Sequence, residues 1–184
     1  MKKIVVLFSG AGSNLAWLAE HLPLHGIGIA AAVTNNPDAG GIAVARSFGI
    51  PVEVLDHRMF ETREAYDAEL AAVVASHRPD VTVLAGFMRV LTPVFTDRIR
   101  AINLHPSLLP RHKGLDAIGR SWEDDHPEGG VSVHWVTGEL DGGAIILQCV
   151  VPKAGLDRRS YEQRIRRLEK RVLLEGVLAA LDRE

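Results

Sequence analysis

Short, unbroken apolar runs recur through the first 85 residues, and segments with helical spacing lie between them. Residues 4–8 read IVVLF and residues 81–85 read VTVLA. A run without polar alternation fits a strand that is buried on both faces, as in a parallel sheet. We expect further strands at residues 27–34 and 52–55, and helices near residues 15–22, 39–48 and 62–77, the last capped by Thr62. Four strands alternating with helices favour right-handed βαβ units.

The pattern changes after residue 100. A fifth strand is expected at residues 101–104, whereas residues 131–136 and 144–151 flank a glycine-containing loop and predict a hairpin. Shorter helices are expected at residues 93–99 and 115–122, and one long amphipathic helix at residues 161–181. The predicted fold is therefore α/β: a Rossmann-like, mostly parallel sheet with helices on both faces, to which the C-terminal half adds an antiparallel hairpin. The 184 residues most simply form a single domain, residues 1–184.

Composition argues against several classes of protein. The formal net charge is −2, which gives no electrostatic case for binding nucleic acid or an anionic membrane. No apolar run is long enough to span a bilayer, and no segment resembles a signal peptide. Cys149 is the single cysteine, so no intrachain disulfide can form. We therefore expect a cytoplasmic protein.

Three unusual segments each follow a predicted strand: residues 9–14 (SGAGSN), residues 86–91 (GFMRVL) and residues 103–110 (NLHPSLLP). In α/β sheets, ligands bind outside the carboxyl ends of the strands. A small-residue turn before a helix leaves main-chain N–H groups free to bind a phosphate. The same turn would also form if Ser13 or Asn14 simply capped the helix, and the sequence leaves both interpretations open.

Asn103 and His105 lie two residues apart, so an extended backbone directs both side chains to one face. An imidazole can hold or donate a proton near neutral pH, and an amide can donate to an oxygen that gains negative charge. The pair suits acyl transfer. A capped turn with a hydrogen-bonded histidine is the simpler alternative.

The segments SGAGSN, LAGFMRVL, NLHPSLLP and SVHWVTGELDGGAII occur in this order, before a helix that carries Glu169. Together they resemble the formyltransferases that depend on 10-formyltetrahydrofolate, in their glycinamide ribonucleotide (phosphoribosylglycinamide) branch. The resemblance covers nearly the whole chain. It implies formyl transfer from 10-formyltetrahydrofolate, as co-substrate, to the glycyl amine of the ribotide in purine biosynthesis. It implies no metal, small-molecule partners only, and a monomer or homodimer.

The resemblance also implies roles for individual residues. Asn103 would bind the formyl oxygen, His105 would be the general acid, and Asp141 would hold His105 and raise its pKa. Half 1–100 would bind the ribotide phosphate, and half 101–184 would carry catalysis and folate binding. The ribotide residues would be Gly12, Ser13, Asn14, Gly86, Met88, Pro106 and Glu169. The folate residues would be Arg63, Met88, Arg89, Val90, Leu91, Asn103 and Asp141. A solvated helix face is the alternative for Arg63, and a surface ion pair is the alternative for Glu169.

The chain departs from the family pattern at several positions. Ala11 and Leu104 stand where Asn and Ile are usual, and Lys170 replaces a histidine. The segment of residues 111–118 lacks the histidines that are expected after Gly114 and Leu115. These departures keep two alternatives open, namely a formyltransferase acting on another amine, such as an amino-sugar nucleotide, and a formyltetrahydrofolate hydrolase. A non-catalytic folate-binding protein would have no need of Asn103, His105 and Asp141 together.

Unrelated functions fit less well. His105, His134 and Asp141 could be drawn as a metal triad, but no His-x-x-His or cysteine pair supports it. The glycine loop fits the dinucleotide fingerprint poorly, since position 15 is Leu15. A tRNA formyltransferase would need a basic surface and an additional domain.

Overall fold

A computed structural model describes residues 1–182 and has one seven-stranded sheet at its centre. The strand order is β3-β2-β1-β4-β5-β6-β7. The first five strands run parallel, and β6 and β7 are antiparallel to their neighbours. The strands are β1 Lys3–Phe8, β2 Gly28–Thr34, β3 Val52–Val54, β4 Val81–Leu84, β5 Ala101–His105, β6 Glu128–Trp135 and β7 Ile145–Pro152. The predicted mixed α/β sheet is confirmed.

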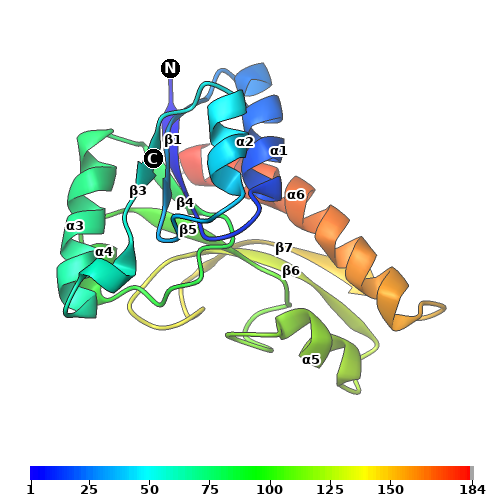
Figure 1. Ribbon diagram of the computed structural model, residues 1–184. Helices are drawn as coiled ribbons and strands as arrows, with labels where there is room; N and C mark the ends of the chain where they lie inside the picture. Colours follow the sequence, from blue (N-terminus) through cyan, green and yellow to red (C-terminus); the bar gives the residue numbers. More distant parts are fainter. Residues whose placement is uncertain (183–184) are drawn as a thin grey trace.

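Helices cover both faces of the sheet (Figure 1). They are α1 Ser13–His21, α2 Gly41–Ser47, α3 Arg63–Ser76, α4 Pro93–Thr96, α5 Ala117–Glu123 and α6 Arg158–Asp182, with short 3-10 turns η1 Leu22–His25 and η2 His57–Met59. The helices α1, α2 and α6 lie against one face, and α3 and α4 lie against the other. No helix within residues 1–182 combines the length and apolarity that crossing a bilayer requires.

The strand β1 shows why the sequence builds two cores. Its side chains alternate, so Ile4 and Val6 join the apolar cluster beneath α1 and α6, whereas Val5 and Leu7 join the cluster beneath α3. All four side chains are fully buried. An unbroken apolar run is therefore what a central strand between two helical layers requires.

Two helix boundaries show how local polar groups set the ends. Thr62 caps α3 as predicted, because its hydroxyl accepts a hydrogen bond from the main-chain N–H of Ala65 at 3.1 Å. The last helix begins at Arg158, three residues before the predicted start. Asp157 accepts the main-chain N–H of Ser160 at 2.7 Å, so a side-chain cap extends this helix beyond its apolar stripe.

Candidate active site

The end of β5 carries Asn103 and His105, and the antiparallel register places β6 beside them. Asn103 lies opposite His134 in this register. The Asn103 Nδ2 atom is 3.2 Å from His134 Nε2, while His134 Nδ1 donates to the main-chain oxygen of Trp135 at 2.8 Å. His134 therefore belongs to the same polar cluster. The sequence suggested His134 only as a poorly supported metal ligand, because a strand register cannot be read from a single chain.

Asp141 joins this cluster from the loop between β6 and β7. Its Oδ2 atom is 3.4 Å from His105 Nδ1 and accepts the Gly114 N–H at 2.8 Å. Its Oδ1 atom is 3.4 Å from His134 Nε2 and accepts from Asn103 Nδ2 at 3.3 Å. The Asp141 carboxylate and the two imidazole rings are almost fully buried, with 7% of the Asp141 side chain exposed. One carboxylate thus connects both strands to the loop that follows β5.

The pKa values of Asp141 and His105 are both lowered, which leaves the carboxyl charged and the imidazole neutral. Burial alone would raise the pKa of Asp141, but its polar contacts with His134 and the Gly114 N–H, and the proximity of His105, lower it to about 2. Burial lowers the pKa of His105, and the His112 carbonyl and Asp141 offset only part of that effect. Asp141 thus acts on the pKa of His105 in the expected direction, and burial outweighs its effect, so the net shift of that pKa is downward.

His105 has an acceptor at each ring nitrogen. Its Nε2 atom donates to the main-chain oxygen of His112 at 2.8 Å, so the neutral ring carries its proton there. Its Nδ1 atom faces Asp141. A proton taken up by the ring would therefore lie between Nδ1 and the Asp141 carboxylate, which favours the charged form once it is made.

The glycine loop (residues 9–14) follows β1, which β4 alone separates from β5 in the sheet. Because these strands are parallel, the loop lies at the same edge of the sheet as the polar cluster. Gly12 is the N-cap residue of α1, with φ 81°, and no side chain caps that end of the helix. A Cβ atom at Gly12 would lie 2.6 Å from the Cα atom of Gly41, so the close approach of α1 and α2 requires glycine. Ser13 and Asn14 start the helix without capping it, which leaves its first N–H groups available to an anion.

The segment after β4 is fixed to the glycine loop and to α3. The Ser9 hydroxyl accepts the Met88 N–H at 2.8 Å. Arg63, expected on the folate side, donates from Nη2 to the Val90 carbonyl at 2.6 Å, and Arg89 lies 4.7 Å above the Tyr66 ring. The arginine at position 63 therefore anchors a loop and is more than a solvated residue of a helix face.

The remaining predicted residues lie around this centre. Gly86 has φ 77° and lies two residues after the end of β4. Leu91 is buried, Met88 is 70% exposed, and Pro106 follows His105 at the end of β5. Glu169 lies on α6, which packs against α1, and burial raises the pKa of its carboxyl to about 7. The ion pairs described along α6 join Arg158 to Glu162 and Arg171 to Glu175, while the charge of Arg166 acts on Glu169. Both interpretations of Glu169 stay predictions.

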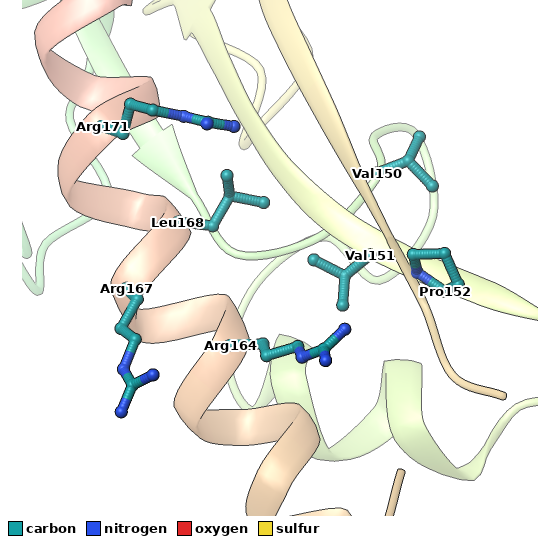
Figure 2. Close-up of a pocket in the computed structure, with 7 residues that line it drawn as sticks. All are labelled: Val150, Val151, Pro152, Arg164, Arg167, Leu168 and Arg171. Carbon is teal, nitrogen blue, oxygen red and sulfur yellow. The ribbon is translucent and has the colours of Figure 1, made fainter. Parts of the chain in front are cut away.

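A separate hollow of about 330 Å³ lies between β7 and α6. Figure 2 shows Arg164 and Arg171 extending over it from the helix, with Leu168 between them and Val151 and Pro152 on the strand. None of the residues that line it belongs to the cluster around Asp141. Within the described part of the chain, no three His, Cys, Asp or Glu side chains are arranged to hold a metal ion.

Comparison with known proteins gives one consistent family. The family model described as "Formyl transferase" matches residues 2–177. Phosphoribosylglycinamide formyltransferase of Escherichia coli is 46% identical over 153 residues, which cover 81% of this chain and 72% of that protein. The enzyme of the same name from Haemophilus influenzae is 40% identical and covers 83% of this chain and 74% of its own length. The crystal structure of phosphoribosylglycinamide formyltransferase from Campylobacter jejuni superimposes with a TM-score of 0.92 at 45% identity, over 96% of each chain.

Proposed function

Because the chain belongs to the formyl transferase family, we propose that it transfers the formyl group of 10-formyltetrahydrofolate to the glycyl amine of N1-(5-phospho-D-ribosyl)glycinamide, in purine biosynthesis. The observation that carries this proposal is the Asp141 carboxylate, which contacts Asn103 and His105 together at the end of β5. The relatives that share 40% to 46% of their residues with this chain bear the name of that enzyme. Neither the hydrolase nor the amino-sugar alternative has such support.

The reaction needs one oxyanion donor and one group that moves a proton. The glycyl amine attacks the formyl carbon, and the carbonyl electron pair moves to oxygen, where an Asn103 N–H donates to the oxyanion. The present Asn103 hydrogen bonds are long, at 3.2 and 3.3 Å, so exchanging one for the oxyanion loses little.

Proton transfer then completes the exchange. The attacking nitrogen carries an extra proton, which the neutral ring of His105 accepts and passes to N10 of the folate as the bond between N10 and the formyl carbon breaks. Tetrahydrofolate and the formylated ribotide leave. Asp141 favours the charged ring in the interval between the two steps, since its carboxylate lies 3.4 Å from Nδ1.

The binding residues follow the same arrangement. The free N–H groups at the start of α1, at Gly12, Ser13 and Asn14, would receive the ribotide phosphate. The segment of Arg89, Val90 and Leu91 would hold the pterin through main-chain groups, with Arg63 and Arg89 beside it. Gly86, Met88, Pro106 and Glu169 would line the path of the ribotide. A cytoplasmic location and the monomer or homodimer state stay predictions.

A formyl-transfer assay tests the proposal. We expect turnover of 10-formyltetrahydrofolate only when the ribotide is present, and His105→Ala should lower kcat by about 10²- to 10⁴-fold, the usual contribution of a general acid or base. His25→Ala, at an exposed position in η1, is the matched control and should keep full activity. Thermal unfolding checks that each variant is folded. Formyl loss without the ribotide would identify a hydrolase, and near wild-type turnover of folded His105→Ala would refute the role of His105.

A further inference from the structure

The carbonyl that holds His105 belongs to a residue in an unfavourable backbone conformation. His112 has φ 57°, the left-handed region, which costs about 1 kcal/mol or more for a residue other than glycine. The direction of its carbonyl depends on that conformation, and this carbonyl is the acceptor for His105 Nε2. Some other contact must therefore keep His112 in place.

Asp124 supplies that contact. It follows the last residue of α5, and its Oδ2 atom lies 2.5 Å from His112 Nε2. Its Oδ1 atom accepts from Lys153 Nζ at 2.6 Å and from the His126 N–H at 3.0 Å. Only 16% of the Asp124 side chain is exposed. The carboxylate is thus bound on both oxygens, and it joins the loop after β5 to the end of α5 and to the residue that follows β7.

The carboxyl group of Asp124 is ionised near neutral pH. Burial alone would raise the pKa of its carboxyl, but the hydrogen bonds from Lys153 and His112 hold that pKa well below its usual range. Arg111 Nη1 also lies 3.7 Å from Oδ2. A buried, ionised carboxylate with several donors is a stronger anchor than an exposed ion pair.

We propose that Asp124 is a positioning residue for the formyl transfer: its carboxylate fixes the side chain of His112, and the main-chain carbonyl of His112 fixes the ring of His105. The proposal rests on the proposed function for its catalytic consequence. The chain of contacts itself, from Asp124 through His112 to His105, lies within the protein and does not involve a substrate.

The first experiment compares Asp124→Asn with Glu123→Gln. Both changes remove one carboxylate from neighbouring positions, but Glu123 is 62% exposed and pairs with Arg158 on the surface. We expect Asp124→Asn to lower kcat by about ten- to a hundred-fold, with the KM of both substrates near wild type, because a misplaced ring affects the chemical step more than binding. Equal kcat values for the two variants would overturn the proposal.

A second experiment needs no turnover. Histidine labelled with ¹³C at Cε1 reports the titration of His105 by NMR, and His105→Gln identifies its resonance. Besides the His112 carbonyl, the ring faces the charges of Asp141, His134 and Arg120. The His112 hydrogen bond favours the protonated ring, so loosening it in Asp124→Asn should move the His105 midpoint to lower pH. A midpoint equal to or above that of Glu123→Gln would overturn the link, even if the formyl-transfer assay succeeds.

A third comparison separates the carbonyl from the side chain of His112. Both variants lose the contact between the His112 ring and Asp124. Glycine adopts positive φ without strain, so His112→Gly keeps the carbonyl direction accessible, whereas His112→Ala keeps the strain. We expect kcat to fall in the order wild type, His112→Gly, His112→Ala. Equal losses in the two variants would show that the His112 side chain acts directly, and would contradict the proposed path through its carbonyl.

Discussion

At the scale of single residues, burial and a neighbouring charge act on the pKa of His105 in opposite directions. Burial favours the neutral ring, and Asp141 favours the charged ring, with burial the larger effect. Asp141 itself stays ionised because it has polar partners on both oxygens. A neutral base beside a permanent carboxylate can accept a proton and give it up again within one reaction cycle.

This arrangement predicts a pH dependence of stability. The folded-state pKa of His105 lies below its unfolded value, so the unfolded chain binds that proton more readily, and stability is lost as the pH falls below about 6.5. Asp141 adds nothing to the slope in this window, because its depressed pKa makes its contribution constant above about pH 4. The free energy of unfolding in urea should therefore fall less steeply between about pH 7 and pH 5 in His105→Gln than in the wild type.

Other groups do not disturb this comparison. The raised pKa of Glu169, to about 7, acts in the opposite direction, since a proton held in the folded state stabilises it as the pH falls. That effect is present in wild type and variant alike and cancels in the difference. His25→Gln, at an exposed position, should keep the wild-type slope. Parallel slopes for His105→Gln and wild type would contradict the lowered pKa.

At the scale of elements, α3 holds the segment that follows β4. Asp67 is 1% exposed, and its Oδ2 atom accepts the Thr92 N–H at 2.6 Å. Arg63, one helical turn before it, holds the Val90 carbonyl. The irregular segment of Arg89 to Leu91 therefore has its shape set by two side chains of one helix.

Removing this link should affect folate binding before chemistry. Asp67→Ala leaves the Thr92 N–H without its partner, which should cost about 1–3 kcal/mol of stability and raise the KM for 10-formyltetrahydrofolate more than that for the ribotide. Steady-state kinetics with each substrate varied in turn, together with urea unfolding, measures both effects. Glu69→Ala, at an exposed position of the same helix, is the control. A change confined to the ribotide KM would refute the role given to α3.

The elements also show what the sequence could predict. Apolar runs such as residues 4–8 predicted the parallel strands, because burial on both faces leaves a clear pattern. The i, i+2 spacing of Asn103 and His105 predicted side chains on one face, and both contact Asp141. The contact of His134 with Asn103 escaped prediction because it arises only through the β5–β6 register. Asp124 escaped prediction because two of its partners, His112 and Lys153, come from distant segments. Contacts between distant segments leave no local signal.

At the scale of the whole molecule, the proposed catalytic residues and a contact that stabilises α6 lie at opposite ends of β5. The site lies at the carboxyl end of β5, whereas Arg100 precedes the first residue of that strand. Arg100 donates from Nη2 to the Ala180 carbonyl at 2.9 Å, in the last turn of α6, and its guanidinium lies 4.7 Å above the Trp135 ring. A cation at the carboxyl end of a helix opposes the partial negative charge there. This contact ties the last helix to the centre of the sheet.

The separation predicts a variant that loses stability and keeps activity. Arg100→Ala removes the hydrogen bond to α6 and the contact with Trp135, which together should cost about 1–2 kcal/mol, or a decrease of about 2–8 °C in Tm for a chain of this size. The kcat/KM for formyl transfer at 25 °C should stay at the wild-type value, because Arg100 lies at the amino end of β5, away from Asn103 and His105 at its carboxyl end. Arg98→Ala, at a neighbouring exposed position, controls for the loss of one positive charge. If Arg100→Ala lowered kcat/KM as much as Asp124→Asn while Tm stayed constant, the two ends of the sheet would be coupled, and the assignment of Arg100 to stability alone would be wrong.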